Sequence, residues 1–348
     1  MGINDVMGRV WRENVLFSAF LELTYRCNLA CRICYNDTAQ QGRPLSREQY
    51  LTLFQDLRDL GTLSLTFSGG EPLAHPDFFA LGAEARRHGF VVRIKTNGHA
   101  LNERLARRVK DEIDPFGLDI SLHGACAETH DRQTGVPGSF HRLLTNLGTL
   151  QDLGLRFSLN CPVTAWNEGE VEAIFALAER LGAYVSFDSD ITPRDDGDRA
   201  PQALAPTPGG VERLERLQLT RERAAATPGL AVPEPSPDAK QCGAGSAGVA
   251  IDPYGTVYPC VQWRRPVGNL HQSSIKAIWR DSQELGRIRQ HTVTVKQLLD
   301  SYEDGHLMGF CAGRAQEETG TPLQVYPLAL ERMKLRQRLR KASATHPR

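Results

Sequence analysis

The alternation of apolar strands with amphipathic helices along the first 190 residues is the feature that most constrains the fold of this chain. The hydrophobic pattern predicts strands at 16–24, 63–67, 90–96, 117–122, 155–160 and 184–188. Helical periodicity falls between them, at 47–60, 77–88, 102–110, 139–153 and 168–181. Such alternation is typical of a parallel sheet covered by helices. We therefore expect an α/β fold, a partial (β/α)6 TIM-like barrel whose open side leaves room for a large substrate.

The composition of the chain changes after residue 192. A proline-rich stretch that contains the charged cluster PRDDGDR is typical of a linker, here around one helix. The chain beyond it is rich in glycine, turns and cysteine, which predicts a small α+β domain. We expect the basic helix that follows to present its charges to solvent. The expected division is a lead-in at 1–14, a barrel at 15–192, a linker at 193–240, an auxiliary domain at 241–325 and a basic helix with its tail at 326–348.

The charge balance bears on partners and location. Lys and Arg number 41, and Asp and Glu also number 41, so the formal net charge at pH 7 is zero. A neutral chain lacks the field that would hold nucleic acid or an anionic membrane. No run approaches the roughly 18 apolar residues of a membrane-spanning helix, and the amino terminus lacks a secretory signal. We expect a cytoplasmic protein without nucleic-acid or membrane partners.

Eight cysteines remain to be explained, because structural disulfides are rare in a reducing cytoplasm. Three of them, Cys27, Cys31 and Cys34, form C-x3-C-x2-C directly after the first predicted strand. Three thiolates can bind three irons of one cubane cluster and leave the fourth iron without a protein ligand. A zinc site that lacks its fourth ligand, or packed core cysteines, are the alternatives.

Polar and glycine-rich motifs follow the next three strands. Gly69, Gly70 and Glu71 follow the second strand, Asn97 the third, and the turn SLHG at 121–124 the fourth. Two adjacent glycines let a backbone approach a ligand closely. Barrels of this kind keep their active sites at the carboxyl ends of their strands. Each motif alone is an ordinary turn, but their succession predicts one shared site.

Together, the cysteine triplet and the strand-end motifs resemble the radical S-adenosylmethionine (SAM) enzymes. The resemblance implies that Cys27, Cys31 and Cys34 hold a [4Fe-4S] cluster whose open iron is chelated by SAM. It also implies a set of cofactor-binding residues: Ile33 and Tyr35 near the adenine, Gly69, Gly70 and Glu71 at the methionyl amino group, and Asn97, Ser121 and Asn160 as further strand-end contacts. The chemistry implied is reductive cleavage of SAM to a 5′-deoxyadenosyl radical, with a flavodoxin or ferredoxin as the reductant.

The second cysteine group is Cys242, Cys260 and Cys311. Its spacing resembles the SPASM or twitch extension, which implies an auxiliary [4Fe-4S] cluster. A full SPASM pattern has seven cysteines and two such clusters, whereas here no cysteine closely precedes Cys311, so we expect one. Its fourth ligand is open between His306, Asp304 and a free coordination position. A zinc ion, or no metal, is the alternative.

Three further residues are candidates for catalysis. Cys126 and Cys161 lie near the ends of the fourth and fifth strands, where a thiol can return a hydrogen atom to a product radical. The alternative for both is that they are ordinary buried thiols. His123 in the SLHG turn can bind substrate or a proton, or can cap a helix.

Two features of the chain bear on the substrate. Because only 26 residues precede Cys27 and one auxiliary cluster is missing, we expect a small natural-product intermediate. A sugar, aminocyclitol or nucleoside would be dehydrogenated, epimerised or decarboxylated, as in antibiotic biosynthesis, by an oxidoreductase or a lyase. The alternative is a maturase that forms a crosslink or thioether in a ribosomally made peptide. A non-catalytic iron–sulfur electron carrier is the third hypothesis.

Overall fold

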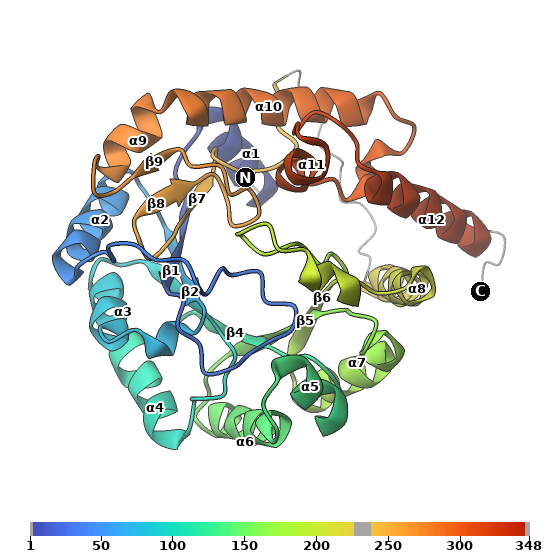
Figure 1. The fold of residues 1–348 in the computed structure, drawn as a ribbon, viewed down its shortest axis with the longest axis horizontal. Helices are drawn as coiled ribbons and strands as arrows, with labels where there is room; N and C mark the ends of the chain where they lie inside the picture. The colour runs from blue at the N-terminus through green and yellow to red at the C-terminus, as the bar shows by residue number, and fades with distance from the viewer. Residues whose placement is uncertain (1–2, 226–237, 345–348) are drawn as a thin grey trace.

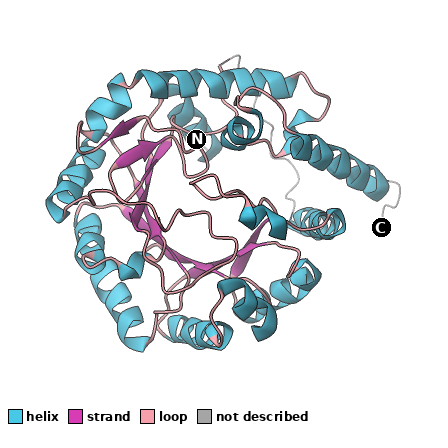
Figure 2. Ribbon diagram, viewed as in Figure 1, coloured by secondary structure: helices cyan, strands magenta, loops and turns pink. Residues whose placement is uncertain are grey.

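The computed structural model describes residues 3–225 and 238–344, which form a curved sheet ringed by helices (Figure 1). Within these residues the sheet has nine strands, in the order β6-β5-β4-β3-β2-β1-β7-β8-β9. All the pairs from β6 through β1 to β7 are parallel, and the pairs β7–β8 and β8–β9 are antiparallel. Figure 2 shows the strands on the inside and the helices on the outside. The predicted α/β fold with a partial barrel is confirmed.

Six strands and the helices that connect them build the barrel. The strands are β1 (Ser18–Thr24), β2 (Ser64–Gly69), β3 (Val91–Thr96), β4 (Gly117–Ser121), β5 (Phe157–Pro162) and β6 (Tyr184–Asp188). The helices are α2 (Arg47–Asp59), α3 (Phe78–Arg87), α4 (Glu103–Arg108), α5 (Ala127–Thr134), α6 (Ser139–Asp152) and α7 (Val171–Arg180). Most predicted strands and helices agree with these bounds to within two or three residues, and the short helix α5 lies in a stretch for which we expected no helix.

The strands separate apolar from polar side chains strictly. Ile94, Leu118 and Leu159 face outward, are fully buried and pack beneath the helices. The alternate positions face the barrel interior, which is the space that β1–β6 partly enclose. Successive side chains of a strand point to opposite faces, so this pattern gives the sheet one apolar and one polar face. The polar face is the wall on which the site is built.

Helix α2 illustrates how local sequence sets an element. Ser46 accepts a hydrogen bond from the Gln49 N–H at 3.3 Å, and the Gln49 side chain accepts one from the Ser46 N–H at 3.1 Å. This reciprocal cap satisfies two of the otherwise unpaired groups at the helix start. Tyr50, Phe54 and Leu57 then recur at helical spacing and are almost completely buried. The amphipathic pattern therefore both begins the helix and fixes its inner face.

The carboxyl-terminal half extends the same sheet. Its elements are α8 (Pro208–Ala225), β7 (Gly248–Ile251), β8 (Thr256–Tyr258), β9 (Gly268–Asn269), α9 (Ile275–Asp281), α10 (Gln283–Asp300), α11 (Ala312–Thr319) and α12 (Pro327–Ala344), and helix α1 (Ile3–Glu13) precedes β1. Strand β7 pairs with β1, with Val249 beside Ala19. The sheet thus passes from the expected barrel segment into the expected auxiliary segment without a break. Residues 226–237 of the expected linker, and 345–348 of the expected tail, lie outside the described residues.

Three helices in this half bear on the expectations. Helices α9 and α10 occupy a stretch that we expected to be mainly turns, although Leu285, Ile288, Val295 and Leu299 repeat at helical spacing and are buried. Helix α12 exists as predicted, and most of its charged side chains are exposed as expected. Arg332 is an exception, because it is only 8% exposed and is ion-paired with Asp190. None of the described helices combines the length and apolar character needed to cross a membrane.

Candidate active site

The first cysteine loop lies over the carboxyl end of the barrel. Its backbone is held by α5, because the Ala30 and Arg32 N–H groups donate to the Thr134 and Gln133 carbonyls, each at 2.9 Å. Gly135 at the end of α5 has φ +71°, and a Cβ there would lie 3.0 Å from the Ala30 carbonyl oxygen. The absence of a side chain at this position is therefore what lets the loop sit this close to α5.

The three thiols of this loop act on one another electrostatically. Burial raises the pKa of Cys31 to about 12, and the neighbouring Cys34 and Cys27 charges raise it further. Burial also raises the thiol pKa of Cys27 and of Cys34. Three partly buried thiolates need a positive partner, and iron supplies one. Within residues 3–225 and 238–344 no group of three or more His, Cys, Asp or Glu side chains is placed to hold a single metal ion.

Gly69 and Gly70 bring the end of β2 against the chain that leads to this loop. Gly69 has φ +129°, and a Cβ there would lie 2.3 Å from the Thr24 carbonyl oxygen. A Cβ on Gly70 would lie 2.6 Å from the carbonyl oxygens of Tyr25 and Arg26. Both glycines line the cavity described below. Their first physical role is close packing of backbone on backbone, which leaves this part of the cavity wall without side chains.

Glu71 is a buried carboxylate bound mainly by the chain itself. It accepts hydrogen bonds from Thr96 Oγ1 at 2.8 and 2.9 Å, from the Asn97 N–H at 2.9 Å and from the Leu73 N–H at 3.2 Å. Burial raises its pKa to about 7 against these stabilising bonds. The Glu71 carboxylate therefore already links the end of β2 to the end of β3. In the expected contact, the methionyl amino group would donate to the same carboxylate oxygens.

Asn97 and His123 approach the cluster cysteines from two strands. Asn97 Nδ2 lies 3.6 Å from Cys27 Sγ. His123 Nε2 lies 4.0 Å from Cys31 Sγ, and the backbone N–H of His123 donates to His130 Nδ1 at 3.2 Å. Burial, together with the nearby His130, lowers the pKa of His123 to about 3, so its imidazole is neutral at pH 7. His123 is thus a neutral side chain beside a thiol, and it does not cap a helix.

These residues surround one cavity of about 1050 Å³. Every residue predicted to bind SAM except Glu71 lines it: Ile33, Tyr35, Gly69, Gly70, Asn97, Ser121 and Asn160. Asn160 accepts a hydrogen bond from Ser186 Oγ at 2.5 Å. The interior wall adds residues that we did not single out from the sequence, including Phe20, Lys95, Asp119 and Asp188. The alternation of apolar with polar residues at 92–95 and 118–121 is the signal that would have found Lys95 and Asp119.

The two isolated cysteines differ in position. Cys126 is exposed and precedes α5, with its thiol 3.5 Å from Thr129 Oγ1 and 3.6 Å from Glu170 Oε1. Cys161 borders the cavity, but its side chain is 1% exposed within the apolar core, with Sγ 3.7 Å from Asn167 Nδ2. Cys161 thus borders the same cavity as the first cysteine loop, whereas Cys126 is not among the residues that line it. The role of these cysteines in hydrogen-atom return stays a prediction.

The second cysteine trio also gathers, although its members lie far apart in sequence. Cys242 precedes β7, Cys260 follows β8, and Cys311 precedes α11. Burial raises the pKa of Cys260 to about 12, and the Cys311 and Cys242 charges add to this effect. His306 and Asp304, the predicted fourth ligands, are both exposed. Asp304 accepts a hydrogen bond from Gln337 on α12 at 3.2 Å.

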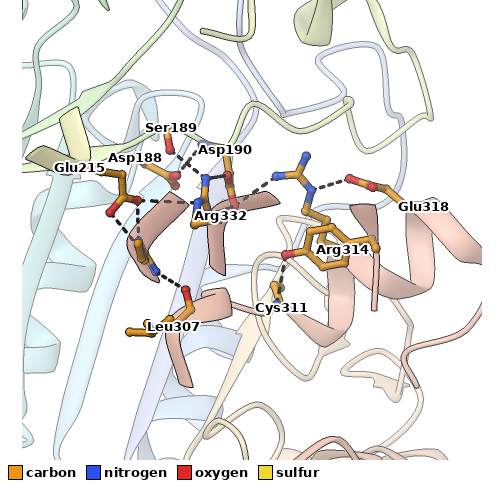
Figure 3. Close-up of polar contacts among 11 residues, drawn as sticks. Asp188, Ser189, Asp190, Glu215, Leu307, Cys311, Arg314, Glu318 and Arg332 are labelled. Carbon is orange, nitrogen blue, oxygen red and sulfur yellow. Dashed lines mark hydrogen bonds and ion pairs between the residues drawn. The ribbon is translucent and has the colours of Figure 1, made fainter. Parts of the chain in front are cut away.

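A buried ion-pair network joins the Cys311 segment to the end of β6 (Figure 3). Asp190 accepts from Arg332 at 2.5 and 3.2 Å and lies 3.1 Å from Arg314 Nη1. The Cys311 N–H donates to Tyr326 Oη at 3.3 Å. Arg314 of α11 and Arg332 of α12 therefore link the segment of Cys311 to Asp190, which lines the cavity.

The same chain matches two family models and several known proteins. The Radical SAM superfamily model matches residues 21–178, and the SPASM model, an iron–sulfur cluster-binding domain, matches residues 242–311. An AdoMet-dependent heme synthase from Methanosarcina barkeri is 26% identical, with 89% of this chain and 95% of the relative covered. A PqqA peptide cyclase from Rhizobium meliloti is 30% identical, with 77% and 74% covered.

Two more comparisons agree with these. The mycofactocin maturase MftC from Mycobacterium ulcerans is 30% identical, with 77% of this chain and 76% of the relative covered. The crystal structure of Streptococcus suis SuiB bound to S-adenosylmethionine superposes with a TM-score of 0.70 at 15% identity, over 94% of this chain and 80% of the other. The chain therefore belongs to the radical SAM superfamily and carries a SPASM domain, and it is an enzyme whose cofactors are SAM and [4Fe-4S] clusters.

Proposed function

We propose that this enzyme modifies a ribosomally made peptide, forming a crosslink or a thioether within it. The observation that carries the proposal is the 30% identity to a PqqA peptide cyclase over 77% of this chain. A maturase at the same identity supports it. The prediction of a small natural-product intermediate is contradicted by these relatives, and the peptide alternative replaces it.

The cavity supports a peptide substrate. Its volume of about 1050 Å³ is at the upper end of the roughly 300–1,000 Å³ of small-molecule sites. Its wall carries hydroxyl, amide and charged groups, among them Ser121, Asn160 and Ser186. Such groups suit the N–H and C=O groups of a peptide, which must keep hydrogen bonds when they leave water.

We propose that Cys27, Cys31 and Cys34 hold the cluster that reacts with SAM, and that Cys242, Cys260 and Cys311 hold an auxiliary cluster. When bound and reduced, the first cluster supplies the electron that cleaves SAM to the 5′-deoxyadenosyl radical. The chain's own residues seat the peptide carbon beside that radical and exclude water. We propose a flavodoxin- or ferredoxin-type protein as the electron donor.

The test uses the full chain, reconstituted anaerobically, with SAM, dithionite and a uniformly deuterated peptide encoded beside its gene. We expect deuterium in the 5′-deoxyadenosine product and a modified peptide that has lost two hydrogen isotopes. One leaves as the hydrogen atom that the 5′-deoxyadenosyl radical abstracts, and the other leaves as a proton or deuteron from the group that forms the new bond to the radical carbon. The electron released in this step would pass to the oxidised auxiliary cluster that Cys242, Cys260 and Cys311 would hold. SAM cleavage without deuterium transfer from the peptide would overturn the proposal. A tetrapyrrole replaces the peptide in a second arm, because one relative is a heme synthase.

A further inference from the structure

The barrel interior of this protein is polar, unlike the usual interior of such folds. TIM-type barrels generally fill their centre with layers of branched apolar side chains. Here the inward positions of the middle strands carry Arg93 and Lys95 on β3, Asp119 on β4 and Ser158 on β5, while their outward neighbours are buried and apolar. A cavity with such a wall is suited to a polar or charged part of the substrate.

Asp119 is the anion of this wall, and the chain itself neutralises it. Arg93 donates to both of its carboxylate oxygens, with Nε 3.2 Å from Oδ2. Ser158 Oγ donates to Oδ1 at 2.8 Å. Three donors from two neighbouring strands therefore hold one carboxylate. The direct hydrogen bonds to Asp119 thus come from Arg93 and Ser158 alone, and Lys95 acts on this carboxylate only through its charge.

Lys95 is the second cation at these inward positions, and its charge acts on Asp119 across the β3–β4 pair, but it makes no direct contact with that carboxylate. Its Cα lies in register with that of Asp119 across the β3–β4 pair, and the residue lines the cavity. Throughout residues 3–225 and 238–344, no carboxylate oxygen lies within ion-pair distance of its ammonium group, and no hydrogen bond from Lys95 Nζ is formed. Asp188, the carboxylate of the cavity wall on β6, is three strand spacings away, which is roughly 14 Å along the sheet.

A partly desolvated ammonium group without a partner is unfavourable, and an incoming carboxylate would remove that cost. The position of Lys95 favours substrate over cofactor as the source of that carboxylate. Lys95 lies one inward position deeper in the barrel than Asn97, and Asn97 is the residue of β3 that approaches the cluster cysteine Cys27. The ammonium group of Lys95 therefore lies deeper in the barrel than Asn97, the predicted SAM contact on the same strand.

We propose that Lys95 binds a carboxylate of the substrate, so that the part of the peptide drawn into the barrel is acidic. An aspartate or glutamate side chain and a carboxyl-terminal carboxylate share this chemistry. The assignment rests on the proposed peptide substrate and makes Lys95 a specificity-determining residue for it. It also gives a role to the hydrogen bonds from Arg93 and Ser158 to Asp119. Without them, Asp119 would compete with the substrate carboxylate for the Lys95 ammonium group.

The experiment measures binding to the SAM-loaded, unreduced holoenzyme by ligand-observed NMR. The probes are N-acetyl-glutamate methylamide, its glutamine counterpart and, for the terminal group, N-acetyl-glycine. We expect the wild-type enzyme to prefer the glutamate or the glycine carboxylate over the neutral glutamine probe by about tenfold or more. Lys95→Met should abolish that preference and Lys95→Arg should retain it. Lys95→Glu should instead favour N-acetyl-lysine methylamide.

The controls separate this proposal from the others. Lys110→Met removes an exposed lysine that donates to the Leu153 carbonyl, and it should keep the wild-type preference. The absorbance of the bound clusters verifies that each variant is folded. Equal binding of charged and neutral probes by the wild type, or the same preference in wild type and Lys95→Met, would overturn the role of Lys95. A loss of SAM affinity in Lys95→Met would also overturn it, by moving Lys95 to the cofactor site. Failure of the peptide proposal appears separately, as absent deuterium transfer.

Discussion

Arg264 donates to both carboxylate oxygens of Glu22, through Nη1 at 3.0 Å and Nη2 at 2.6 Å. The same guanidinium reaches Asp195, with Nε 3.1 Å from Oδ1. Arg264 lies four residues after Cys260, and Glu22 lies on β1 five residues before Cys27. One buried cation therefore links the segment of the second cysteine trio to the strand that carries the first.

Replacing Arg264 by Met should destabilise the fold strongly. Glu22 has no solvent exposure, so the variant leaves its charge buried and unpaired, a change that costs about 3–5 kcal/mol in other proteins. Urea titration under anaerobic conditions measures the free energy of unfolding. Arg213→Met is the matched control, because its ion pair with Glu172 is about half exposed on both sides and should contribute far less to stability. Equal losses in the two variants would contradict the prediction.

Cys27→Ala should remove the cluster that reacts with SAM. Each thiolate holds one iron, and two remaining thiolates are too few to retain a cubane cluster. We expect iron and sulfide to fall by about four per chain and 5′-deoxyadenosine formation to cease. Chemical iron and sulfide analysis and chromatography measure the two effects. Full iron content in this variant would show that the trio is not the ligand set.

Cys311→Ala tests the auxiliary site separately. Because Cys311 precedes α11 and lies outside the first cysteine loop, SAM cleavage should survive in this variant. Iron should again fall by about four per chain, while modification of the peptide should be lost. A variant that keeps its full iron content, or that stops cleaving SAM, would show that the two trios do not hold separate clusters.

His123→Phe should make the first cluster harder to reduce. The wild-type imidazole nitrogen lies 4.0 Å from Cys31 Sγ, and hydrogen bonds to sulfur stabilise the added negative charge of a reduced cluster. We expect a more negative midpoint potential in an EPR-monitored titration. His141→Phe, a change on the exposed side of α6, should leave the potential unchanged. Retention of the wild-type potential in His123→Phe would exclude this contact.

Glu71 should make stability depend on pH. Burial raises its pKa from about 4.5 to about 7 in the folded chain, so the folded state holds a proton that the unfolded state has already released. The contribution to stability is therefore fully present below pH 4.5 and is lost as the pH rises through 7. The loss amounts to about 3 kcal/mol. The difference in unfolding free energy between wild type and Glu71→Gln should follow this direction, and a constant difference between pH 4.5 and 7 would contradict it.

Much of the candidate site could be predicted because its residues follow strands at fixed positions. Cys27, Gly69, Asn97 and Ser121 each come directly after or at the end of a strand, and parallel strands bring such positions to one face. Glu71 shows where this reasoning stops. Its place in the motif was evident from the sequence. Its hydrogen bonds with Thr96 and the Asn97 N–H, however, depend on how the ends of β2 and β3 pack together.

The sequence by itself determined the order of strands and helices, the polar face of the sheet and the two cysteine trios, since hydrophobic period and residue spacing are local properties of the chain. Tertiary structure alone decided which charges meet. Arg264 and Glu22 are 242 residues apart, and Arg332 and Asp190 are 142 apart. A basic helix has the same local pattern whether its charges face water or a partly buried carboxylate, and only the closure of the fold around β6 turns Arg332 of α12 toward Asp190.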